Sequence, residues 1–238
     1  AYSSVPALEG KLEGANLHHF GLNNNQIEAM SKFSTVTGLL LHSHWTNPQL
    51  SDCIVIGHVV RISPNIIITA RHCLNEMDID ELYITFLKLP LMKIQYLVED
   101  GAYNNLDYTL FSFEPPTLLP GIPISKHAHH SIPKAWIGGA SDGDRVQYFS
   151  TWEQRGLFYP VQAVSTYPAT KPASSGSGYF CFDNQTLDAI HTKQSIDGMF
   201  DKERTAVFTW NIATIPGSIL KTLHYAQPTL LPSWLLNL

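Results

Sequence analysis

The sequence predicts an all-β protein made of many short strands, and three observations support this fold class. Short β-type runs separated by turn residues occur along most of the chain. Fifteen glycines and fifteen prolines punctuate these runs, as many tight turns require. Stretches with apolar residues at helical spacing are scarce. Many short strands with few helices indicate a β-sandwich or β-barrels.

The expected strands form two groups, one in each half of the chain. The first group is TVTGLLL, CIVIGHVVRI, NIIITA, LYITFL, IQYLV and DYTLFSF, and the second is KAWIGG, RVQYFSTW, FYPVQAVST, GYFCF, LDAIH and TAVFTWN. We expect one helix at Asn25–Phe33, begun by an asparagine cap. A second helix is expected after Pro216, where GSILKTLH carries apolar residues at helical spacing.

A proline-rich segment, EPPTLLPGIPISKHAHHSIP, separates the two groups of strands. Proline lacks an N–H and cannot occupy a central strand, so we interpret this segment as a linker. The predicted organisation is an N-terminal extension at 1–34, a first β-barrel at 35–117, a linker at 118–134, and a second β-barrel with a C-terminal helix and tail at 135–238. The two β-rich units are of nearly equal size.

The composition fits a compact globular protein and excludes several classes of function. Hydrophobic residues make up 44% and charged residues 15%, which argues against disorder. A net charge of −5 gives no electrostatic footprint for nucleic acid. No apolar run approaches the roughly 20 residues that span a bilayer, and no signal-peptide pattern begins the chain. Three cysteines leave at least one thiol unpaired.

Three segments supply the groups that peptide hydrolysis by a serine requires: a base, a carboxylate that orients it, and a nucleophile. His72 ends the strand-like run SPNIIITARHC, Asp107 stands at the start of the apolar run in NNLDYTLFSF, and Ser175 lies in the small-residue cluster of KPASSGSGYFCF. Each also has an ordinary interpretation when taken alone: a structural histidine, a turn aspartate and a flexible loop.

Taken together, the segments resemble the trypsin-like serine peptidases, most closely the glutamyl endopeptidase branch. TARHC resembles the family's TAAHC, NLDYTLFSF resembles DIALLKL, and ASSGSGYFC resembles GDSGGPLVC or GNSGSPVF. The order His, Asp, Ser is that of chymotrypsin-type enzymes, and the resemblance covers roughly residues 35 to 225. It implies two six-stranded antiparallel β-barrels, a short C-terminal helix, and endopeptidase activity with His72, Asp107 and Ser175 as catalytic triad. We accordingly expect an exported or secreted protein that acts on protein or peptide substrates.

The chain departs from the family pattern beside the nucleophile. The family's oxyanion hole uses the N–H of the nucleophile and of a glycine two residues earlier, positions held here by Ser175 and Ala173. If this backbone needs a positive φ, alanine costs about 1 kcal/mol or more. The loop would then be inactive until substrate or an activating partner binds. The alternative function is therefore a weak or inactive trypsin-like fold that serves as a protein-binding module; a third is a viral-type processing peptidase.

Two further residues match the pocket that reads the side chain before the cut. Thr170 and His191 fall where glutamyl endopeptidases hold an acidic or amide side chain. Both can donate hydrogen bonds, and an apolar side chain would leave them unpaired. We therefore predict a preference for Glu or Gln. The alternative is that His191 is a packed strand histidine and that the pocket takes small apolar side chains.

The other histidines carry no metal prediction. His127, His129 and His130 lie in the proline-rich linker without spaced cysteine or acidic companions, so surface histidines are the better interpretation. The same holds for His42 and His44. We predict no metal site and no cofactor.

The cysteines are expected to remain mostly free. The family disulfide beside the catalytic histidine would use Cys73, and its partner position falls on Gly57. Cys53 lies four residues before Gly57, about 13 Å away along a strand, which is too far for a bridge unless a β-bulge absorbs the difference. Cys181 is expected to be a small buried hydrophobic residue.

Overall fold

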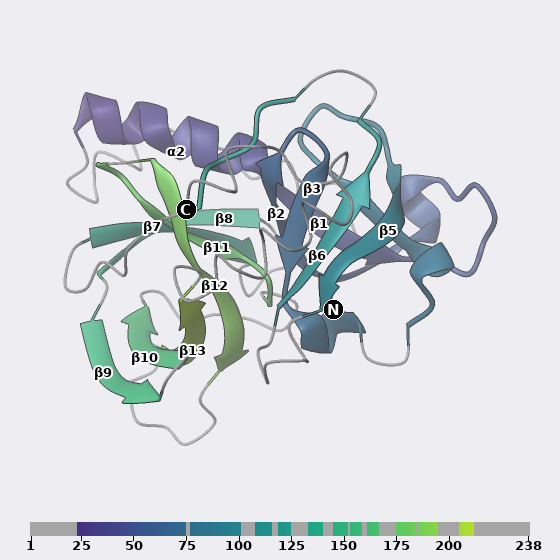
Figure 1. Ribbon diagram of the computed structural model, residues 1–238. Coiled ribbons are helices and arrows are strands. Elements are labelled where there is room, and N and C mark those ends of the chain that lie inside the picture. Colours follow the sequence, from purple (N-terminus) through teal and green to yellow (C-terminus); the bar gives the residue numbers. More distant parts are fainter. Residues whose placement is uncertain are drawn as a thin grey trace.

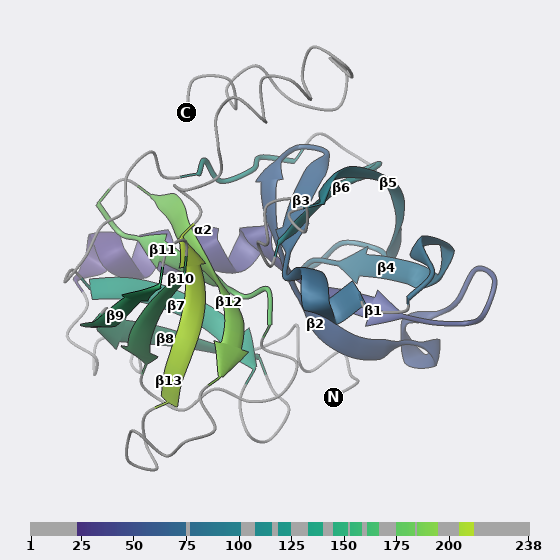
Figure 2. The same ribbon diagram turned by 60° about the horizontal axis from the view of Figure 1, so that its bottom comes forward.

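The structure is a computed structural model of the chain (Figures 1 and 2). It describes residues 23–74, 77–100, 108–115, 119–124, 133–139, 145–151, 153–158, 161–166, 175–183, 185–194 and 205–211. The described part is mostly β-structure and consists of a closed barrel, a second sheet and one α-helix. In this part, no helix combines the length and the apolar character needed to cross a membrane.

The barrel closes six antiparallel strands in the order β1-β2-β3-β6-β5-β4. These strands are β1 (Thr37–His42), β2 (Ile54–Ser63), β3 (Ile66–Thr69), β4 (Leu82–Thr85), β5 (Met92–Asp100) and β6 (Thr109–Phe113). Each β-type run expected in the first half of the chain supplies one of them. The prediction of an antiparallel barrel in this half is confirmed.

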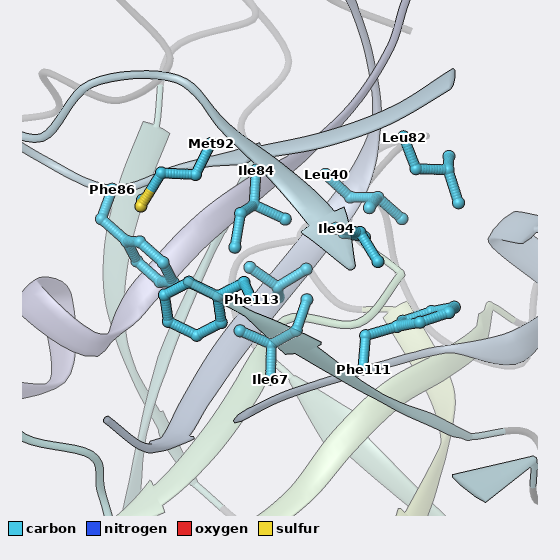
Figure 3. Packing of buried hydrophobic residues seen from close by; sticks show 10 residues of the cluster. Leu40, Ile67, Leu82, Ile84, Phe86, Met92, Ile94, Phe111 and Phe113 are labelled. Carbon is cyan, nitrogen blue, oxygen red and sulfur yellow. The ribbon is translucent and has the colours of Figure 1, made fainter. Parts of the chain in front are cut away.

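Apolar side chains from all six strands fill the barrel (Figure 3). Phe86 and Phe113 lie side by side with ring centroids 6.0 Å apart. The cluster consists of Leu40, Val59, Ile67, Leu82, Ile84, Phe86, Met92, Ile94, Phe111 and Phe113. Burying a side chain of this size contributes roughly 1.5–3 kcal/mol. This core gives the barrel a rigid frame on which the segments at its ends are held.

The second half of the chain forms a seven-stranded sheet in the order β8-β7-β11-β12-β13-β10-β9. Its strands are β7 (Pro133–Gly139), β8 (Arg145–Thr151), β9 (Glu153–Phe158), β10 (Val161–Thr166), β11 (Gly178–Cys181), β12 (Thr186–Gln194) and β13 (Thr205–Asn211). The sequence predicted all of these strands except β9. The described strands of this half form a sheet and do not show a second closed barrel. The expected C-terminal helix lies outside the described residues.

Helix α2 (Asn24–Val36) precedes the barrel and runs along the seven-stranded sheet (Figure 1). Asn23 caps it: the Asn23 side chain accepts from the N–H of Gln26, whose side chain accepts in return from the N–H of Asn23. The helix buries Phe33, whose ring stacks on Phe180 of β11 at 4.7 Å. The predicted helix with an asparagine cap is confirmed, and it begins earlier and ends later than expected.

A short segment, residues 119–124, bonds to both β-units. The N–H of Ile122 donates to the carbonyl of Arg61 in β2 at 2.9 Å. On the other side, the N–H of Leu187 in β12 donates to the carbonyl of Pro123, also at 2.9 Å. This part of the predicted linker therefore holds the barrel and the sheet together along one seam.

Arg61 strengthens the same seam from inside the barrel. Its side chain is buried, and the guanidinium carbon lies 4.5 Å from the centroid of the Phe86 ring. Its Nε donates to the carbonyl of Pro120 at 2.8 Å. Burial lowers the pKa of Arg61 to about 10, so the side chain is still charged at neutral pH. The aromatic ring and the carbonyl partly offset the cost of burying that charge.

Candidate active site

The loop that carries Ser175 is held from both β-units. The carbonyl of Ser175 accepts from the N–H of His58 in β2, and the N–H of Gly176 donates to the carbonyl of His191 in β12, both at 2.8 Å. Gly176 has φ +89°, and a Cβ there would lie 2.1 Å from the carbonyl oxygen of His58. Only glycine fits this position. The described part of this segment, which begins at Ser175, is therefore a tightly fixed turn and not a loose loop.

His72 lies in the short 3-10 helix Arg71–Leu74 that follows β3. Its Nε2 is 2.8 Å from Oγ of Ser175, which is hydrogen-bond distance. The strand before it is anchored by Thr69, whose hydroxyl donates to the carbonyl of His58 at 2.7 Å. An imidazole at this distance can accept the hydroxyl proton when Nε2 carries no hydrogen of its own. The pair joins the barrel to the sheet, because each unit supplies one member.

Of the other residues predicted for this site, only His191 lies within the described part of the chain. Asp107, Thr170 and Ala173 lie outside it. Within the Ser175 segment, Ser177 is fully buried, whereas Ser175 is half-buried and contacts the exposed His72. The geometry therefore distinguishes the two described serines of this segment.

His191 is buried in β12 behind the Ser175 loop. The ring nitrogen Nδ1 of His191 lies 3.3 Å from the hydroxyl of Tyr179. The backbone N–H of His191 donates to the carbonyl of Ser177 at 2.8 Å. Burial, with smaller contributions from the charges of His72 and His58, lowers the pKa of His191 to about 3. Burial also raises the pKa of Tyr179 well above its usual value. Both side chains are therefore neutral at physiological pH, so one ring nitrogen of His191 donates and the other accepts.

Gly57 in β2 lies next to Cys73, as counting along the hairpin predicts. A Cβ at Gly57 would be 2.9 Å from Sγ of Cys73 and 2.9 Å from the carbonyl oxygen of Ser175. Cys53, Cys73 and Cys181 are all free, and Cys181 is buried, so the predictions for the thiols are confirmed. The glycine leaves room for the carbonyl of Ser175 beside the barrel.

The barrel has a hollow that sequence reasoning missed, and one of its lining residues, Arg71, directly precedes His72 in the chain. It has a volume of about 450 Å³, and Arg71 lies in its wall with Asp100, joined by an ion pair of 2.7 Å. Its apolar lining includes Leu74, Leu97 and Phe111. These residues come from three separate segments, so no local motif could have indicated it.

Neither a family model nor a curated protein matches this chain.

Proposed function

We propose that the chain is a serine endopeptidase of the trypsin-like kind. The observation that carries the proposal is the 2.8 Å contact between Nε2 of His72 and Oγ of Ser175. In the proposed reaction, Ser175 attacks the scissile carbonyl while His72 takes its proton, and His72 then returns that proton to the leaving amine. Water hydrolyses the acyl-enzyme in a second, equivalent step.

Asp107 is proposed to orient His72 and to stabilise the imidazolium that forms. The support comes from the register of the barrel. Thr69 of β3 pairs with Thr109 of β6. Asp107 comes two residues before Thr109, and His72 comes three residues after Thr69. In an antiparallel pair the end of β3 and the start of β6 lie at the same end of the barrel, and these are the strand ends that His72 follows and Asp107 precedes in the sequence. The finer proposal for the fold is that the second sheet closes into a second six-stranded barrel. In that barrel β8, which pairs with β7, and β9, which pairs with β10 and begins two residues after β8 ends, count as one strand.

The proposed oxyanion donors are the N–H groups of Ser175 and Ala173. The N–H of Gly176 already donates to the carbonyl of His191 in β12 at 2.8 Å, so it is not available to a substrate. This excludes Gly176 as a donor and agrees with the pair that the family resemblance implies, the nucleophile and the residue two positions before it. A preformed donor at Ala173 would make the site active, and a rotated peptide there would make it dormant.

His191 and Thr170 are proposed to favour Glu or Gln before the cut. When the Tyr179 hydroxyl donates to Nδ1 of His191, which lies 3.3 Å away, Nε2 keeps its hydrogen and can donate to a substrate oxygen. A neutral imidazole serves a carboxamide as well as a carboxylate. The burial of His191 fits the alternative of a packed strand histidine equally, so the substrate profile must decide between them.

The test is cleavage of a peptide library, with cut positions read by mass spectrometry. We expect cuts in the wild type that Ser175→Ala reduces by about a thousandfold or more. Ser177→Ala is the matched control, because it removes a hydroxyl two residues away, and its activity should stay close to wild type. His191→Ala should flatten any preference for Glu or Gln. A folded wild type that cuts no peptide would favour the protein-binding alternative.

A further inference from the structure

Two histidines and a glutamate meet at one end of the barrel, apart from the His72–Ser175 pair. Nε2 of His42 lies 2.8 Å from Oε2 of Glu81, and Nδ1 of His44 lies 3.0 Å from Oε1 of the same carboxylate. One ligand atom from each residue lies within 4.8 Å of the other two. From the sequence alone, His42 and His44 are expected to be surface histidines without an acidic companion; Glu81 lies 37 residues beyond His44 in the chain.

The backbone of the barrel fixes two of these residues. His42 ends β1 and pairs with Leu82 at the start of β4, directly after Glu81. The N–H of Ser43 donates to the carbonyl of Glu81 at 3.1 Å. The side chain of His42 is 12% exposed and that of Glu81 32%, whereas His44 is 79% exposed. Two ligands are therefore held in place, and the third stands at the mouth of the cluster and can adjust.

We propose that His42, His44 and Glu81 bind a divalent transition-metal ion, zinc in the first instance. Two imidazole nitrogens and one carboxylate oxygen are ligands that zinc uses in proteins. Bonds of 2.0–2.2 Å in a tetrahedron separate the ligand atoms by about 3.4 Å. The two nitrogen–oxygen separations are 2.8 and 3.0 Å, and the three ligand atoms lie within 4.8 Å of one another, so small side-chain rotations bring them to this spacing. Water supplies the fourth ligand from the solvent side.

The charges at the cluster suit a cation. The Glu81 carboxylate faces both rings, with one oxygen at hydrogen-bond distance from each imidazole nitrogen. A bound metal needs neutral imidazoles and an ionised carboxylate. The ion replaces protons that would otherwise mediate the contacts between Glu81 and the two rings.

The site has a structural role in this proposal. The loop after β1 lies at the end of the barrel away from the seven-stranded sheet (Figures 1 and 2). A metal at His42, His44 and Glu81 ties this loop to the start of β4. It shares no residue with the His72–Ser175 pair, so the proposal does not depend on the proposed peptidase activity.

The test uses the full chain, stripped of metal with a chelator and titrated with zinc chloride by calorimetry. Cobalt(II) in place of zinc gives a visible absorption spectrum that reports tetrahedral coordination. Even the loss of a residue that only hydrogen-bonds to a metal ligand typically lowers metal affinity by about 10–100-fold, and the loss of a ligand itself should cost at least as much. His44→Ala and Glu81→Gln should therefore each weaken the binding by about tenfold or more and abolish the cobalt spectrum. Zinc should raise the melting temperature of the wild type and not that of His44→Ala.

The control is a triple variant, His127→Ala with His129→Ala and His130→Ala, which removes the histidine-rich stretch and should bind zinc as the wild type does. His44 is exposed, so His44→Ala should fold normally, as circular dichroism in chelator will check. Zinc affinity unchanged in His44→Ala, or lost in the triple variant, would overturn the proposal. Absence of any binding to the folded wild type would overturn it as well.

Discussion

A disulfide engineered beside the candidate active site probes how β2 packs against the 3-10 helix that carries His72. In Gly57→Cys, the new Cβ would stand 3.7 Å from Cβ of Cys73 and 2.9 Å from its Sγ. The Cβ–Cβ distance in disulfides is about 3.5–4.5 Å. The structure therefore predicts that this single substitution forms a bridge with Cys73 under mild oxidation.

The expected gain in stability follows from the loop that the bridge closes. Cross-linking a loop of about 15 residues lowers the entropy of the unfolded chain enough to contribute about 3 kcal/mol. The new Cβ would also lie 2.9 Å from the carbonyl oxygen of Ser175, so this peptide must shift slightly. The net gain of oxidised over reduced Gly57→Cys should be about 2–3 kcal/mol, a rise in melting temperature of roughly 4–12 °C.

Thiol titration in denaturant, followed by thermal unfolding with and without reductant, measures both quantities. The oxidised variant should show two free thiols, those of Cys53 and Cys181. Gly57→Ser is the matched control, because it adds a side chain of similar size that cannot form the bridge. Four titratable thiols after oxidation, with no effect of reductant on the melting temperature, would show that β2 and the 3-10 helix of His72 do not pack as described.

Three further predictions concern stability and the Ser175 loop. Because the pKa of His191 falls from 6.5 to about 3 on folding, the unfolded chain binds the extra proton below pH 6.5, and stability drops as the pH falls through this window. Urea unfolding should show a slope of up to about 1.4 kcal/mol per pH unit that His191→Gln removes; an unchanged slope would contradict the burial of His191. Phe33→Ala should cost about 3–5 kcal/mol in urea unfolding, whereas exposed Lys32→Ala should cost little; equal costs would mean that Phe33 does not pack on the sheet. Gly176→Ala should destabilise the protein by about 2 kcal/mol or more, since φ is +89° and the Cβ meets a carbonyl; wild-type stability would refute the turn.

The sequence was informative where local patterns decide the structure. Apolar β-type runs predicted all six barrel strands, and an asparagine cap predicted α2. Strand β9 was missed because its sequence, EQRGLF, carries charged residues and a glycine, which strands disfavour. Its place in the sheet depends on its pairing with β10, and the sequence of one segment alone does not reveal such a pairing.

The candidate site was predicted by resemblance and not by spacing. His72 and Ser175 lie far apart in the chain, and only similar motifs in the expected order suggested that they meet. Two features were beyond that reasoning. The burial of His191 depends on what packs over β12, and the approach of Glu81 to His42 depends on the register of β1 with β4. Both are long-range consequences of how the strands pair.

Active-site labelling tests the central claim, that His72 activates Ser175, most directly. The folded wild type is treated with an organofluorophosphonate probe, and peptide mapping by mass spectrometry locates the modified residue. We predict one label on Ser175, lost in Ser175→Ala, kept in Ser177→Ala and formed far more slowly in His72→Ala. Labelling of another residue, or a rate at Ser175 that His72→Ala leaves unchanged, would contradict the account.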